Sequence, residues 1–141
     1  MRRLHLTLLF SLPALAACQP AAAASNREMA QCIAAFHFGR QVWLSQSPPN
    51  YQALAPLTAG SIYYANKLKA AGVADGGKAD AIAFAERHAD DAPLMAETLK
   101  ACGQRQIADP DFVRQFVALT RQAILVDAAC KPDPGRCQKR R

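Results

Sequence analysis

Apolar residues recur at helical spacing along this chain between residues 25 and 130. The alternation of apolar and polar residues that marks a half-buried strand is absent, Val and Ile are sparse, and Ala dominates. The pattern therefore predicts an all-α protein, folded as a single small bundle of four to five helices. A body of this length suits one compact domain, which we place at residues 25–130.

Capping residues and prolines set the bounds of the first two predicted helices. The first begins at Ser25, where Glu28 three residues later completes a capping box, and it stops before Pro48. The second carries Pro56 in its first turn, where a missing N–H loses no hydrogen bond, and it stops near Gly72.

A proline interrupts the third helical segment, which extends from after Gly77 to about Cys102. Pro93 either kinks one long helix or separates two helices. In an up-down bundle, one unbroken helix would carry Cys102 about 37 Å away from the end that holds Cys32, whereas bridged Cα atoms lie within roughly 7 Å. A break capped by Asp91 returns Cys102 towards Cys32. We therefore predict the break together with a Cys32–Cys102 disulfide.

The last predicted helix has the clearest pattern. Asp109 caps it and Pro110 is its first residue. A second set of apolar residues broadens its main apolar face, which predicts a wide buried surface. The main face comprises Phe112, Phe116, Leu119, Ala123, Val126 and Cys130, and the second set comprises Val113, Val117 and Ile124.

The number of cysteines points to an oxidised, exported protein. Cys18 belongs to the N-terminal segment, which leaves four others: Cys32, Cys102, Cys130 and Cys137. An even number in a small exported domain indicates two disulfides with three alternative pairings, while four buried free thiols would also fit the count. Besides Cys32–Cys102 we expect a local Cys130–Cys137 bridge across a turn of Pro and Gly residues. No two cysteines have the close spacing of zinc ligands, so we predict no metal site.

The first residues have the layout of an export signal. Arg2 and Arg3 precede an apolar run of about 14 residues, shorter than the roughly 20 residues that span a membrane. Three alanines at residues 22–24 fit an ordinary small-residue cleavage site. Cleavage there would remove residues 1–24 and leave a soluble periplasmic protein.

A second way of processing follows from a short motif inside this signal. Four residues resemble the lipobox of bacterial lipoprotein precursors: Leu15-Ala16-Ala17-Cys18. The resemblance implies that a signal peptide at residues 1–17 is removed and that Cys18 is lipidated as the new N-terminus. Residues 18–24 would then form a short tether, and Gln19 after the cysteine implies the outer membrane.

The net charge of +6, from 17 Lys and Arg against 11 Asp and Glu, belongs to the ends of the chain. Residues 1–24 contribute +2, residues 131–141 contribute +4, and residues 25–130 hold ten basic and ten acidic side chains. A neutral body lacks the basic surface with which a domain binds nucleic acid. The basic tail at residues 131–141, which carries the local disulfide loop, favours contact with anionic lipid instead.

Residues suited to catalysis or cofactor binding are few. Beyond the signal only His37 and His88 remain, and no nucleophile-elbow, zinc-protease, haem-attachment or phosphate-loop motif is present. We therefore predict no enzyme activity and no cofactor. Arg40 lies near the centre of the apolar face of the first helix, so it must reach solvent, form an ion pair, or contact a ligand or partner.

The sequence thus predicts a non-catalytic helical binding protein of the bacterial cell envelope, facing the periplasm. Its partner would be an envelope protein or a small ligand, and the residues available for contact are Arg40, His37, His88 and Trp43. The alternative is a periplasmic carrier that holds a small hydrophobic or haem-like ligand between its helices. Such a cavity would be lined by Phe36, Trp43, His88 and Met95.

Overall fold

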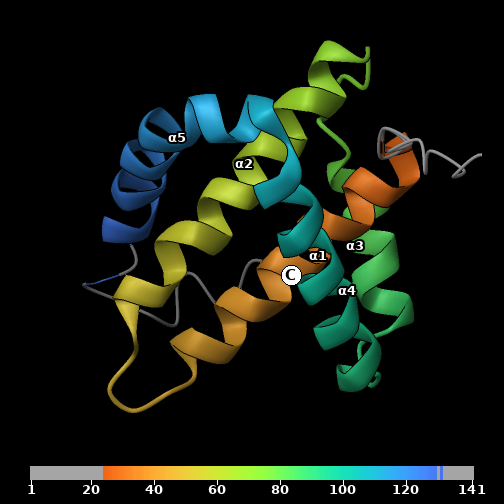
Figure 1. The fold of residues 1–141 in the computed structure, drawn as a ribbon. Helices are drawn as coiled ribbons and strands as arrows, with labels where there is room; N and C mark the ends of the chain where they lie inside the picture. Colours follow the sequence, from red (N-terminus) through yellow and green to blue (C-terminus); the bar gives the residue numbers. More distant parts are fainter. Residues whose placement is uncertain (1–23, 130, 132–141) are drawn as a thin grey trace, which may run out of the picture.

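The computed structural model describes residues 24–129 and 131, and the regular elements among them are all helical (Figure 1). This confirms the predicted all-α class. The elements are α1 (Asn26–Leu44), the short 3₁₀ helix η1 (Tyr51–Ala53), α2 (Leu54–Ala70), α3 (Lys78–Arg87), α4 (Ala92–Ala108) and α5 (Pro110–Ala128).

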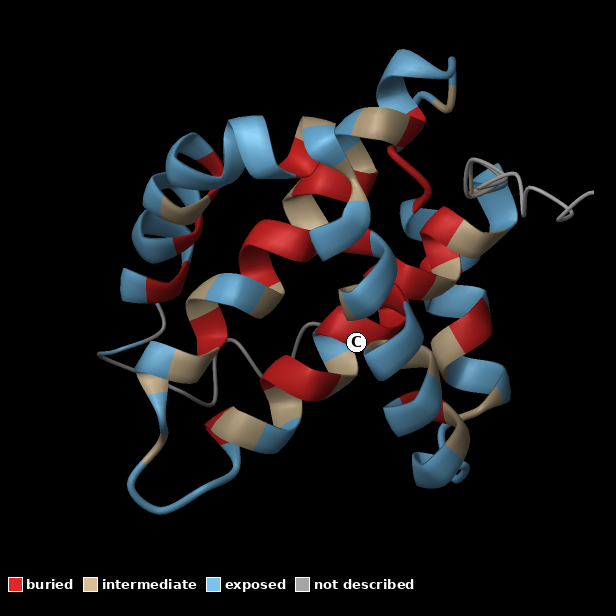
Figure 2. Cartoon of the chain, viewed as in Figure 1, coloured by how far each residue is buried: buried red, intermediate tan, exposed pale blue. Residues whose placement is uncertain are grey.

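Helices α1 and α2 form the centre of the bundle. They lie side by side and run in opposite directions, with α3 and α4 packed against α1, and α5 packed against α2 (Figure 1). Buried residues concentrate on α1 and α2 and are sparser on the outer helices (Figure 2). The two flanks of the bundle, α3–α4 and α5, are therefore attached to different members of the central pair.

The predicted helix ends at Ser25 and Gly72 are confirmed. The Ser25 side chain accepts the N–H of Glu28 at 3.2 Å, and the Glu28 carboxylate accepts the N–H of Ser25 at 2.8 Å, which completes the capping box. At the end of α2, Gly72 has a φ of 88°, which a residue without a Cβ adopts freely. The N–H of Val73 then reaches back to the carbonyl of Leu68 at 2.9 Å, as in a Schellman motif.

The predicted break before Pro93 is also confirmed. Helix α3 ends at Arg87, and α4 begins at Ala92 with Asp91 as its cap, whose carboxylate accepts the N–H of Leu94 at 3.0 Å. Helix α4 runs on to Ala108, however, and not only to about Cys102 as predicted. The sequence carries no stop signal before Asp109, which caps the next helix, so α4 continues up to that point.

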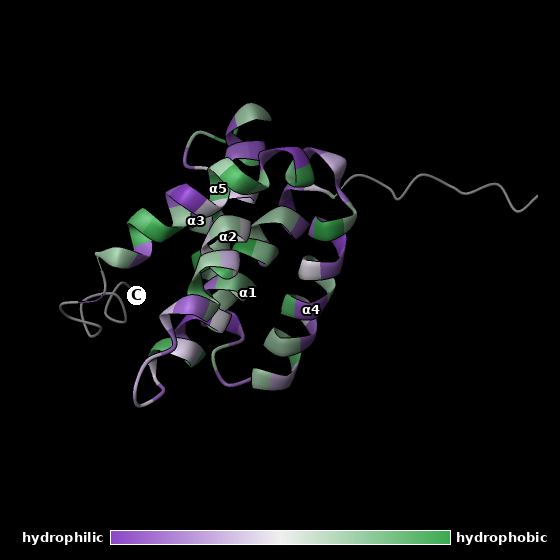
Figure 3. Ribbon diagram, turned by 60° about the vertical axis from the view of Figure 1, so that its left-hand side comes forward, coloured by the Kyte–Doolittle hydropathy of each residue, from purple (hydrophilic) through white to green (hydrophobic). Residues whose placement is uncertain are grey.

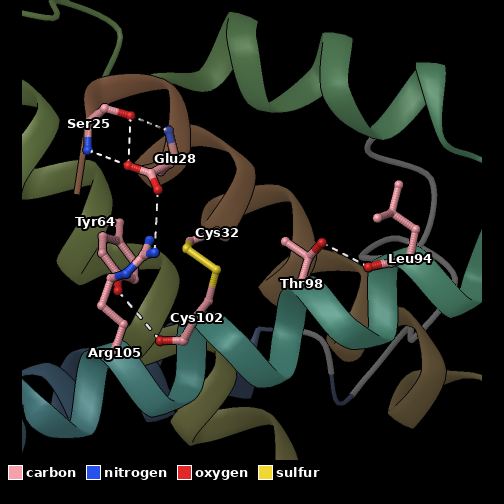
Figure 4. The surroundings of a disulfide bond; sticks show 8 residues. All are labelled: Ser25, Glu28, Cys32, Tyr64, Leu94, Thr98, Cys102 and Arg105. Atoms are coloured by element: carbon pink, nitrogen blue, oxygen red, sulfur yellow. Dashed lines mark hydrogen bonds and ion pairs between the residues drawn. A yellow bond between two sulfur atoms is a disulfide. The ribbon is translucent and has the colours of Figure 1, made fainter.

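The break brings Cys102 back to Cys32, and the two form the predicted disulfide, with Cα atoms 5.5 Å apart. Figure 4 shows the bridge joining the first half of α1 to the middle of α4. Arg105, one turn further along α4, lies 3.4 Å from Glu28 of α1 beside it. The predicted Cys130–Cys137 bridge lies outside the described residues and stays a prediction.

A row of aromatic rings crosses the core from α1 to α5. Phe36 stacks on Tyr64 with ring centroids 6.1 Å apart, and Tyr63 meets Phe112 edge-on at 5.2 Å. Gly60 of α2 lets Phe36 approach, because a Cβ at this position would lie 2.7 Å from the Phe36 ring. Close approach of α1 and α2 therefore depends on a glycine at residue 60.

Replacement of Gly60 tests this packing. Gly60→Ala should lower the free energy of unfolding by about 1–3 kcal/mol, since the added methyl overpacks the contact with Phe36. Gly103→Ala is the matched control, because a Cβ there meets no atom within 4 Å. That control should raise stability by up to about 1 kcal/mol through helix propensity. Urea unfolding monitored by circular dichroism measures the stability of both variants. Equal effects of the two substitutions would contradict the packing described.

Candidate functional site

Arg40 lies in a buried ion pair that joins three helices. Its Nη2 atom is 2.7 Å from Oδ1 of Asp127 on α5, and the two side chains are 9% and 7% exposed. Thr58 of α2 donates its hydroxyl to the same carboxylate, at 2.9 Å from the oxygens. A buried charge is stable only when it is paired and hydrogen-bonded in this way. Of the three outcomes predicted for Arg40, the structure shows the ion pair.

Asp127 was not among the predicted site residues, although its spacing along the helix carried a signal. Asp127 continues the series Leu119 and Ala123 at intervals of four residues, and all three are buried. The prediction instead assigned Val126 and Phe116 to the buried face of this helix, and that assignment is wrong. The two side chains are 45% and 44% exposed.

The other predicted contact residues lie towards opposite ends of α1. His37 and Trp43 flank Arg40, and Trp43 is half-buried. Desolvation, followed by the nearby charge of Arg40, lowers the pKa of the His37 imidazole. His88 follows α3, and its ring packs 4.7 Å from that of Phe84, which faces the beginning of α1. His37 and Trp43 therefore each lie within one turn of Arg40 on α1, whereas His88 lies elsewhere.

Two hollows on the surface are small. One of about 260 Å³ lies between α1 and α3, with Arg27, Phe84 and Arg87 in its lining. A second, of about 150 Å³, lies beside the disulfide between α1 and α4. The residues expected around a carried ligand line neither hollow: Phe36, Trp43, His88 and Met95. Within the described residues, no group of three or more His, Cys, Asp or Glu side chains could hold a metal ion.

A second polar cluster fixes the corner between α4 and α5. Oδ2 of Asp109 accepts hydrogen bonds from the Tyr63 hydroxyl at 2.6 Å and from Nζ of Lys67 at 2.8 Å, while Oδ1 accepts the N–H of Asp111. Partial burial alone would raise the pKa of Asp109, but these three hydrogen bonds outweigh it and lower the pKa to about 2. Burial and the bond to Asp109 raise the pKa of Tyr63 to about 12. The cluster is therefore a charge-assisted cap that ties α5 to α2.

Helix α5 contacts the bundle mainly along the side that faces α2. The second apolar set, predicted to be buried, is exposed: Val113 is 59%, Val117 63% and Ile124 54% accessible. This prediction was wrong because α2 covers only one side of α5, which appears largely pale blue in Figure 2. Hydrophobic segments, drawn green, alternate with polar ones on the same helix (Figure 3). We use the term outer face of α5 for Val113, Val117, Ile124 and Leu125 together with Arg114 and Arg121.

The outer face has the chemistry of a contact surface. Val113, Val117 and Ile124 lie on one side of the helix, and Leu125, which is 75% exposed, lies beyond two exposed arginines. A group of exposed apolar side chains on a small domain marks a candidate interaction site. These apolar residues were visible in the sequence, but they are more than one neighbouring helix can cover.

Comparison with known proteins adds no assignment. No protein-family model, curated protein or solved structure matches this chain. None of the helices in the described part of the chain is both long and apolar enough to cross a membrane.

Removal of one partner of the buried ion pair should destabilise the fold strongly. Arg40→Met and Asp127→Leu should each lower the free energy of unfolding by about 3–5 kcal/mol, since each leaves a buried charge unpaired. The double substitution should cost less than either single one. Arg105→Met is the matched control, because Arg105 pairs with Glu28 at the surface and should contribute less than about 1 kcal/mol. Additive losses in a double-mutant cycle would contradict the coupling.

The Asp109 cluster should make stability depend on pH in acid. Because the folded pKa of about 2 lies below the ordinary value of 3.8, the stabilisation is complete above pH 5 and is lost as the pH falls towards 2. Asp109→Asn should therefore have a lower free energy of unfolding than the wild type at pH 7. The difference between the two free energies should shrink as the pH falls from 4 to 2. Asp111→Asn, which keeps the contacts of Asp109 with Lys67 and Tyr63, is the control. A difference that is constant over this range would rule out the effect.

Proposed function

We propose that this chain is a non-catalytic interaction protein of the bacterial cell envelope. It is exported through the signal at residues 1–17, anchored at the outer membrane by a lipid on Cys18, and faces the periplasm. The lipobox resemblance supports the anchor, although Cys18 and its neighbours lie outside the described residues. The Cys32–Cys102 bridge supports export, because disulfides persist in oxidising compartments such as the periplasm.

One observation supports the interaction role above the others: the exposure of the outer face of α5. Its apolar side chains remain accessible although α5 is attached to the bundle at both ends, by Asp109 and by Asp127. Exposure therefore does not result from loose packing of the helix. An accessible apolar surface on a firmly held helix is suited to binding another component.

Photo-cross-linking in living bacteria tests this proposal. A photoreactive side chain at Val117 should form adducts with an envelope component, because this residue lies on the outer face of α5. The same side chain at Ile82, which is 40% exposed on α3, is the matched control and should not. Labelled fatty acid given to the same cells should be incorporated into the wild type and not into Cys18→Ala.

Two results would contradict the proposal. Equal yields of adducts at Val117 and Ile82, or none at Val117, would exclude α5 as the contact surface. A wild-type protein that carries no lipid and begins at Ser25 would show cleavage after Ala24 and a soluble periplasmic protein.

A further inference from the structure

We propose that the outer face of α5 binds the anionic surface of a phospholipid bilayer, with the helix lying along it. The inference rests on the proposed function, since it names the partner of the same surface. It is carried by two independent features of α5, the arrangement of its exposed apolar residues and the sign of its exposed charges.

The exposed apolar residues form a stripe along the helix. At 100° per residue, Val113, Val117 and Ile124 lie within about 40° of one another, and they extend over about 16 Å of the helix axis. Arg121 and Arg114 lie along one edge of this stripe, between it and Leu125. An exposed apolar stripe with basic side chains along its edge is what an interfacial helix places among lipid head groups.

The charges on this part of the molecule are predominantly positive. Arg114, Arg121 and Lys131 are exposed, while Asp127 is buried and neutralised by Arg40. The remaining acid of α5, Asp111, pairs with Arg114. Such a surface complements an anionic partner.

The positive charge increases beyond α5. Residues 25–109 hold eight basic and eight acidic side chains, and α5 itself holds two of each. The excess of four basic side chains in residues 110–141 comes entirely from residues 131–141, which follow the helix in the sequence.

The same charges argue against a second copy of this chain as the partner. Two outer faces placed together would bring four arginines into contact, with only the paired Asp111 of each copy to offset them. At a bilayer, by contrast, Arg114 and Arg121 border the apolar stripe and can extend to lipid phosphates while their stems cover apolar surface. Helix α5 also lies at an edge of the molecule, where a flat surface can reach it (Figure 1).

Vesicle binding tests the proposal. Residues 18–141 carrying Cys18→Ala are used, so that neither the signal at residues 1–17 nor an attached lipid can contribute, and co-sedimentation is compared on vesicles of phosphatidylcholine with and without phosphatidylglycerol. We expect binding to the anionic vesicles that weakens as salt is added. The double variants V117D/I124D and R114E/R121E should each weaken it by about tenfold or more.

Matched substitutions elsewhere serve as controls. The variant I82D/K100E makes equivalent changes at exposed positions of α3 and α4. It should bind as tightly as the protein that carries only Cys18→Ala. All substituted residues are exposed in part or in full, and circular dichroism confirms that each variant is folded. Every variant keeps the same N-terminus, so a difference between variants reports on α5.

Three outcomes would overturn the proposal. The first is no preference for anionic vesicles, and the second is binding that the α5 substitutions leave unchanged. The third is a concentration-dependent dimer that Ile124→Asp abolishes, which would assign the face to a second copy. Protein adducts at Val117 without vesicle binding would exclude the bilayer and leave the interaction role intact, so failures of the two proposals can be told apart.

Discussion

Arg40 carries a full positive charge into the interior of a small domain. The positions of three helices depend on the ion pair and hydrogen bonds that compensate this charge. Asp127 has to lie at hydrogen-bond distance from the guanidinium, which fixes the end of α5 against α1, and Thr58 adds a contact from α2. A slip of α5 by one turn would move Asp127 by about 5.4 Å and break all of these contacts. We infer that the ion pair sets the register of α5, because the apolar residues of this helix extend too far around it to define a single inward face.

The start of α5 is fixed by a different polar contact. Asp109 caps the helix and also receives Tyr63 and Lys67 of α2, so a single carboxylate sets both where α5 begins and where it docks. With both ends held by carboxylates, the middle of the helix does not need contacts on its outer side to stay in place. This explains how Val117 and Ile124 can remain exposed in a well-packed domain, and it separates the residues that stabilise the fold from those available for binding.

The features that depend on local chemistry could be predicted from the sequence. The Ser25 capping box, the glycine at the end of α2 and the break capped by Asp91 each act within a few residues, and the structure confirms all three. The Cys32–Cys102 pair could also be predicted, because the short Cα–Cα distance of a disulfide requires the helix break before Pro93. Other contacts between remote segments could not be predicted from the sequence. Many acidic residues could have paired with Arg40, and only the packing of α5 on α2 selects Asp127 over them. Exposure of Val113 and Val117 was missed for the same reason, because helical periodicity shows which residues are apolar but not how many neighbours a helix has.

The Cys32–Cys102 bridge also bears on when the domain completes its fold. The residues between the two cysteines include all of α2 and α3, so the bond cannot form until the chain has folded back on itself across most of the bundle. It also cannot persist where thiols are kept reduced. In an exported chain, the attachment of α4 to α1 would be locked only after translocation, so the precursor stays easier to unfold during its passage. Arrival in the oxidising compartment and completion of the native structure would then be a single event.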